Sequence, residues 1–137
     1  MNKKRLNEFI PLGLFLLSGT CVLFNVPEVK LVMAISCVWI SGLYFYGAFW
    51  LYSDYPIPLV TRIVAGLLFS VNTVACGMCF LNWSGQYNYG IANFCGLGIL
   101  IIIELFNYKS VEYKPLFYRT IFFIIVFCLL YGYRRFL

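Results

Sequence analysis

The sequence predicts an all-α, polytopic integral membrane protein with about five transmembrane helices and a cytoplasmic N-terminus. Of its 137 residues, 63% are hydrophobic and only 11% are charged, whereas soluble domains carry about 25% charged residues. The apolar residues lie in runs close to the roughly 20 residues that cross a bilayer as a helix. The polar pieces between these runs are too short for a soluble domain with its own core. We therefore expect one transmembrane helical domain over residues 1–137.

The apolar runs define the helices in order. The first run ends at the turn Asn25-Val26-Pro27, the second contains no charged residue, and the third follows Arg62. The fourth follows a polar turn around Gly85. The fifth contains Arg119 one turn after its start, and we expect this side chain to snorkel to the membrane surface. The predicted helices are 9–25, 31–52, 63–81, 89–106 and 116–133, which make two hairpins and a C-terminal helix, with a four-helix arrangement as the alternative.

Lysines and arginines in the short loops predict the orientation, because they gather on the cytoplasmic side. With the N-terminus inside, the cytoplasmic cations are Lys3, Lys4, Arg5, Arg62, Lys109, Lys114 and Arg119. The external cations are then Lys30, Arg134 and Arg135. The cytoplasmic cations would attract anionic lipid, and they give no indication of nucleic-acid binding. We expect the N-terminus inside and the C-terminus outside.

Several classes of enzyme are disfavoured by composition. The chain has no histidine, which removes the usual ligand of haem and of most zinc and copper sites, and the commonest general base. Its five acidic residues are scattered, and no glycine-rich phosphate loop or Ser–His–Asp set is present. We therefore expect no catalytic residues, no cofactor and no metal.

Small residues recur along one face of the third predicted helix. Small side chains at this spacing let membrane helices approach closely, so we expect them to pack mainly against the fourth helix, with a contact to another subunit as the alternative. The expected packing residues are Gly66, Ser70, Thr73 and Gly77 in the third helix and Ala92 and Gly96 in the fourth.

Polar residues inside the predicted spans are candidates for an ion or proton site. Asn72 and Asn93 are amides in otherwise apolar helices, and we expect a structural interhelical hydrogen bond for them, with an ion or substrate site as the alternative. Glu104 is the only acid within a predicted span, and intramembrane acids are functional hypotheses by default. Its position near Asn107 would also let it snorkel to the cytoplasmic surface.

Cys76 and Cys79 are a further candidate pair, because residues three apart share a helix face. This arrangement resembles the quinone-coupled thiol oxidases, which carry a CxxC pair at the outer end of a small bundle. Those families need a second cysteine pair in an exposed loop, and no predicted loop here contains one. The Cβ separation in a regular helix, about 5–6 Å, also exceeds the roughly 3.8 Å of a disulfide. We expect free, buried thiols.

The turn between the third and fourth helices carries a family resemblance. The stretch Phe80-Leu81-Asn82-Trp83-Ser84-Gly85-Gln86, followed by Gly96-Leu97-Gly98, resembles the F-K-x-x-H-W-P-G-A … G-x-G hairpin of GldL. GldL is the membrane subunit of the gliding and type 9 secretion motor of Bacteroidota, and related small proteins share the hairpin. The resemblance covers residues 63–107 and rests on Trp83, Gly85 and the later glycines.

The chain also departs from that pattern, with Asn82 in place of His and Ser84 in place of Pro. GldL has a proton-coupling Glu directly after the second Gly of its second helix, whereas the nearest acid after Gly98 here is Glu104. The resemblance implies a hairpin-type subunit of a larger bacterial inner-membrane assembly.

These observations together predict a non-enzymatic small membrane subunit that lies in the lipid bilayer and packs with other subunits or with itself. A small ion- or proton-coupled transporter acting as an oligomer is the first alternative. A membrane thiol-redox protein that uses Cys76 and Cys79 is the second.

Overall fold

Five long α-helices make up almost all of the described chain. The computed structural model describes residues 3–24, 26–51, 57–83, 85–107 and 114–136, and no strand occurs among them. Lys109 and Ser84, used above for the orientation and for the hairpin motif, lie outside the described residues. The helices are α1 (Lys3–Leu23), α2 (Lys30–Leu51), α3 (Leu59–Leu81), α4 (Gln86–Phe106) and α5 (Lys114–Phe136), and the short 3₁₀ helix η1 (Pro27–Val29) joins α1 to α2.

Each of the five helices is long and apolar enough to cross a membrane, which confirms the predicted all-α class with five candidate spans. The helix ends differ from the prediction. α1 begins at Lys3 rather than at residue 9, so that its apolar window, Leu6–Leu23, includes Glu8. The reason is that Lys, Arg and Glu are good helix formers, so the polar flank continues the helix.

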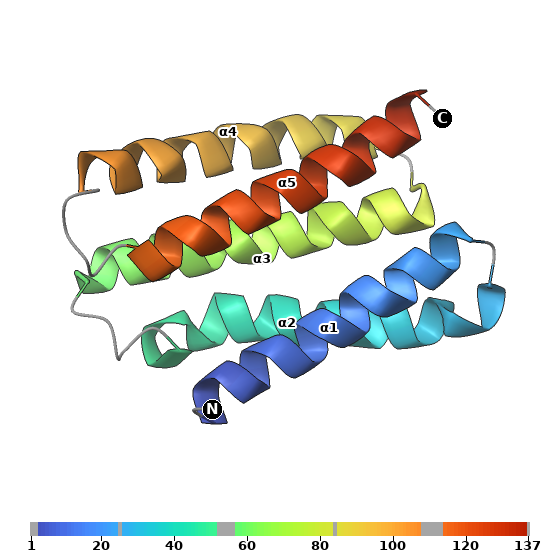
Figure 1. Ribbon diagram of the computed structural model, residues 1–137, viewed down its shortest axis with the longest axis horizontal. Coiled ribbons are helices and arrows are strands. Elements are labelled where there is room, and N and C mark those ends of the chain that lie inside the picture. Colours follow the sequence, from blue (N-terminus) through green and yellow to red (C-terminus); the bar gives the residue numbers. More distant parts are fainter. Residues whose placement is uncertain (1–2, 25, 52–56, 84, 108–113, 137) are drawn as a thin grey trace.

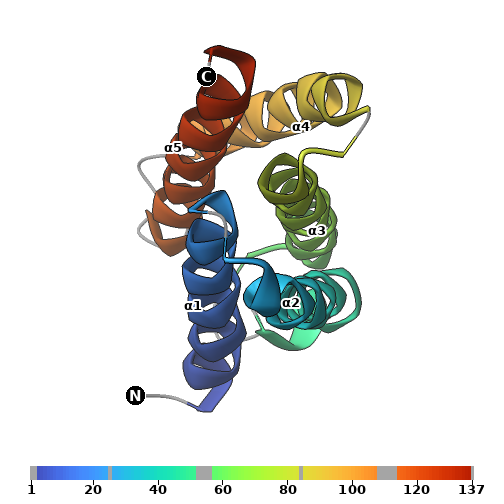
Figure 2. The same cartoon turned by 90° about the vertical axis from the view of Figure 1, so that its right-hand side faces the viewer.

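The helices alternate in direction, and α3 lies at the centre of the bundle (Figures 1 and 2). α3 is the most buried of the five and packs against α1, α2, α4 and α5. The α1–α2 pair lies on one side of α3 and the α4–α5 pair on the other. α1, α3 and α5 all begin at the same end of the molecule, and we call this end the N-terminal end of the bundle.

At the other end of the bundle, a turn at Gly85 joins α3 to α4, and Arg134 of α5 contacts the end of α3. Gly85 adopts a left-handed conformation with φ of 83°, which glycine accepts without steric cost. Arg134, near the end of α5, donates from Nε to the Cys79 carbonyl at 2.6 Å and from Nη2 to the Phe80 carbonyl at 2.7 Å. A cation is favourable at a helix C-terminus, so the guanidinium joins the end of α5 to the end of α3.

Candidate functional site

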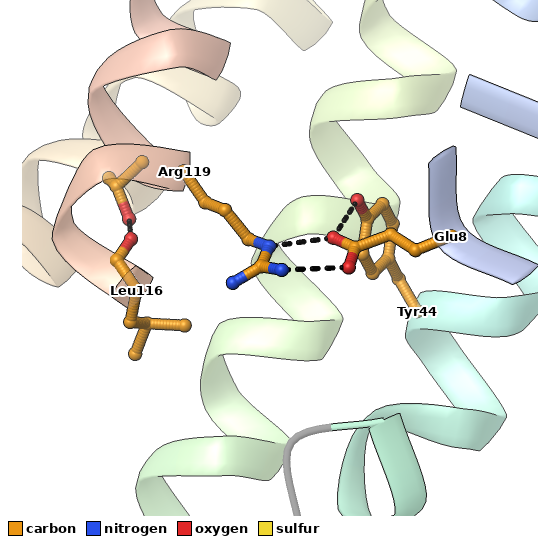
Figure 3. A network of polar contacts seen from close by, with 5 residues as sticks. Glu8, Tyr44, Leu116 and Arg119 are labelled. Atoms are coloured by element: carbon orange, nitrogen blue, oxygen red, sulfur yellow. Dashed lines mark hydrogen bonds and ion pairs between the residues drawn. The ribbon is translucent and has the colours of Figure 1, made fainter. Parts of the chain in front are cut away.

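Three polar side chains from three helices meet inside the bundle near its N-terminal end (Figure 3). Arg119 of α5 donates from Nε to Glu8 Oε1 at 2.7 Å and from Nη2 to Glu8 Oε2 at 2.9 Å. The Tyr44 hydroxyl of α2 donates to Glu8 Oε1 at 2.9 Å. Glu8, on α1, therefore accepts a two-pronged arginine contact and a phenol hydrogen bond. Such two-pronged Arg–carboxylate contacts are among the strongest polar contacts in proteins.

This ion pair corrects the prediction that Arg119 snorkels outward. Its side chain is only 13% exposed and that of Glu8 1%. Glu8 and Arg119 each lie near the start of a helix that begins at the same end of the bundle, so the two charges lie at similar depth. An arginine at the centre of a membrane helix costs about 2.5–3.5 kcal/mol, and this is an upper bound for Arg119, which lies near the start of α5. A lateral contact with Glu8 offsets this cost within the bundle.

Buried aromatic rings pack around Tyr44, beside the ion pair. The Tyr44 ring contacts Phe69 of α3 at a centroid distance of 5.5 Å and Phe123 of α5 at 5.8 Å, and the two phenylalanines lie 5.0 Å apart. All three rings are buried. Such pairs contribute about 0.5–1.5 kcal/mol each beyond their buried area. The rings also exclude water, which strengthens the polar contacts beside them.

Glu104 forms a second polar contact, between α4 and α5. The side chain is fully buried, so the expectation that it snorkels to the surface is wrong. Its Oε1 lies 2.8 Å from the hydroxyl of Thr120, and that hydroxyl also lies 2.9 Å from the Leu116 carbonyl. Glu104 Oε2 is buried with no hydrogen-bond partner among the described residues.

The two predicted amides bond to each other. Asn93 of α4 donates from Nδ2 to Asn72 Oδ1 of α3 at 3.0 Å, and both side chains are buried. Glu104 is not part of this contact, because Leu97 and Leu100 lie between it and Asn93 on the same buried face of α4. The structure therefore does not bring the three candidate ion-site residues together.

The small-residue stripe of α3 faces α2 rather than α4. Ser70 shares a 2.8 Å hydroxyl contact with Ser41 of α2, and a Cβ on Gly77 would lie 3.1 Å from the Cys37 sulfur. Gly66 and Thr73 are buried in the same helix, and the Thr73 hydroxyl donates to its own helix at the Phe69 carbonyl, 2.6 Å away.

The two small residues predicted in α4 do not face this stripe. Ala92 is exposed, and a Cβ on Gly96 would meet Leu68 of α3. Gly96 therefore packs against α3 as predicted, but at Leu68 and not at the stripe. The expected match of the stripe with Ala92 is wrong, because the stripe lies at the α2–α3 seam.

Cys76 and Cys79 are free, buried thiols in an unbroken α3. Gly77 between them is a packing position against α2 and does not interrupt the helix. In the described part of the chain no group of three or more His, Cys, Asp or Glu side chains could hold a metal ion.

No family model, curated protein or solved structure matches this chain. The resemblance of residues 63–107 to the GldL hairpin therefore stays a prediction. The functional argument has to come from the polar contacts and from the surface of the bundle.

Sequence reasoning missed the Glu8–Arg119 pair, although a signal for it was present. The first predicted helix begins at residue 9 and leaves Glu8 outside, and Arg119 is expected to reach the membrane surface and not another side chain. Glu8, however, directly precedes the predicted start of the first helix at residue 9, Arg119 lies about one turn after the predicted start of the fifth, and both helices begin on the same side. Opposite charges at matching depth in two spans are a reason to expect a pair.

Proposed function

We propose that this protein is a non-enzymatic subunit of a bacterial cytoplasmic-membrane complex, with its N-terminus in the cytoplasm, that packs against a transmembrane helix of another subunit. The observation that supports this proposal most directly is a groove on the outside of the bundle, along the α2–α3 seam. Two adjoining hollows of about 210 and 380 Å³ form it, and Cys37, Val38 and Val74 line both of them.

The groove has the composition of a helix-packing surface. Its remaining walls include the small residues Ala34 and Gly77 in the first hollow and Ser41, Gly42 and Ser70 in the second. Membrane helices associate through close backbone approach at small residues and through interhelical hydrogen bonds. The half-buried Ser41 hydroxyl, 2.8 Å from that of Ser70, adds a polar group at the groove.

Site-specific photo-crosslinking tests the proposal. A photoreactive amino acid is placed in the groove at Val38, which is 74% exposed, and in a control at Leu129 of α5, which is 70% exposed. In intact membranes the Val38 probe is expected to give one discrete protein adduct that also co-purifies in stoichiometric amount in mild detergent. The Leu129 probe is expected to give mainly lipid adducts. Equal, diffuse labelling from both positions, with recovery of a lone monomer, would contradict the proposal.

A small proton-coupled transporter is the second candidate, and the buried Glu104 is the observation that favours it. The separation of Glu104 from the Asn72–Asn93 contact argues against one shared polar cavity. In liposomes, Glu104→Gln would abolish a proton-dependent flux if this candidate were correct, and an unchanged flux would remove it.

A further inference from the structure

The two buried acids of the bundle have very different hydrogen-bonding environments. Glu8 receives two guanidinium N–H groups and a phenol O–H, and it faces a full positive charge. Glu104 has one hydroxyl beside it and no Lys or Arg nitrogen within 4.0 Å among the described residues. A carboxylate without a cation is expensive to bury in an apolar medium, so the two acids are not expected to share a charge state.

The hydrogen bonds of the Thr120 hydroxyl indicate whether the Glu104 carboxyl group is protonated. A threonine hydroxyl carries one hydrogen and can donate only one full hydrogen bond. Thr120 Oγ1 lies within hydrogen-bond distance of two oxygens, 2.9 Å from the Leu116 carbonyl and 2.8 Å from Glu104 Oε1. A carbonyl oxygen can only accept. If Glu104 were ionised, one of these short oxygen–oxygen contacts would therefore lack a full hydrogen of its own.

Both contacts are satisfied when Glu104 carries a proton. The acid O–H then donates to Thr120 Oγ1, and the Thr120 hydroxyl donates to the Leu116 carbonyl. The remaining oxygen, Oε2, which is unpartnered among the described residues, becomes a neutral carbonyl-type acceptor. An unpaired neutral acceptor costs about 1–3 kcal/mol, and a charged group costs more.

We infer that Glu104 is a proton-binding site of the folded protein, held as a neutral carboxylic acid by Thr120 in the α4–α5 contact, while Glu8 is ionised. This inference goes beyond the proposed subunit role and does not depend on it. It places one proton between Glu104 Oε1 and Thr120 Oγ1. It also predicts that a reagent for protonated carboxyl groups modifies Glu104 and not Glu8.

Infrared spectroscopy of the full-length protein in lipid nanodiscs is the first test. A protonated carboxylic acid has a C=O stretching band above the amide I band, and a carboxylate does not. The wild type is expected to show a band that is lost in Glu104→Gln and kept in Glu8→Gln. Glutamine keeps the shape of Glu104 and can donate to Thr120, so Glu104→Gln is expected to fold, with circular dichroism as the check. A band that survives Glu104→Gln, or that disappears in Glu8→Gln alone, would overturn the inference.

A second test uses the wild-type protein and needs no variant to fold. An apolar carbodiimide reacts with a protonated carboxyl group in apolar surroundings. The acid proton moves to one carbodiimide nitrogen, the carboxyl oxygen adds to the central carbon, and the adduct rearranges to a stable N-acylurea. Peptide mass spectrometry is expected to locate this adduct on Glu104 and not on Glu8. Labelling of Glu8 with Glu104 unmodified would contradict the assignment.

Discussion

The most informative perturbation of the bundle is to remove one partner of the buried ion pair. Arg119→Leu deletes both guanidinium contacts to Glu8 and leaves the carboxylate with only the Tyr44 hydroxyl among the bonds described above. Removing one partner of a buried pair costs about 3–5 kcal/mol, because the other charge stays buried after it has lost that partner. We expect Arg119→Leu and Glu8→Leu each to lower the free energy of unfolding by about this amount.

The Glu8→Leu/Arg119→Leu double variant measures what the ion pair as a whole contributes to stability. Replacing both members of a buried pair by apolar residues is often neutral or stabilising by about 1–4 kcal/mol. Here the Tyr44 hydroxyl would lose its acceptor, at a cost of about 1–3 kcal/mol. These terms nearly cancel, so the Glu8→Leu/Arg119→Leu protein is expected to lie within about 2 kcal/mol of the wild type.

The assay is reversible unfolding of the purified protein in mixed micelles, followed by circular dichroism as the denaturing detergent increases. Lys30→Leu is a matched control, because it removes an exposed cation at the start of α2, and its effect is expected to stay within about 0.5 kcal/mol. Single-variant costs below about 1 kcal/mol, as found for exposed pairs, would refute the buried pair. A double variant whose cost equals the sum of the single variants would refute the coupling between the two residues.

Two further predictions concern packing and thiol chemistry. A Cβ on Gly19 of α1 would overlap the Phe80 ring of α3, whereas Gly13 of the same helix has nothing within 4 Å. Gly19→Ala is therefore expected to destabilise by about 1–3 kcal/mol in the same unfolding assay, while Gly13→Ala is neutral or slightly stabilising, and equal effects would count against this packing. The buried Cys76 and Cys79 are expected to label slowly with a membrane-impermeant maleimide and to show no mass change on reduction, and rapid labelling of either would restore the redox alternative.

The five helices can be predicted from the sequence because the length of an apolar run depends on local composition alone. The ends are less predictable. The first predicted helix begins at residue 9, yet α1 begins at Lys3, because helix-forming charged residues extend a helix beyond its apolar core. This shift of a few residues is what excluded Glu8 from the predicted spans.

Which neighbouring helix each face of α3 packs against could not be predicted from local composition. Sequence neighbours usually pack together, so the sequence predicts that the Gly66–Gly77 stripe packs against the following helix. α3 contacts all four other helices. Which of these helices a residue of α3 contacts depends on the direction in which its side chain points from the α3 axis. Asn72 lies about 200° around the helix from Ser70. Asn72 therefore bonds to α4 while Ser70 meets α2.

The polar contacts of α5 connect the two halves of the bundle. Arg119 bonds to Glu8 of α1, and the next residue, Thr120, contacts Glu104 of α4. Glu8 has a guanidinium partner, whereas Glu104 has none among the described residues. The proton inferred on Glu104 removes the cost of burying a carboxylate without a cation, and it also completes the hydrogen bonds of Thr120. A variant of Glu104 that cannot carry this proton is therefore expected to weaken the contact between α4 and α5.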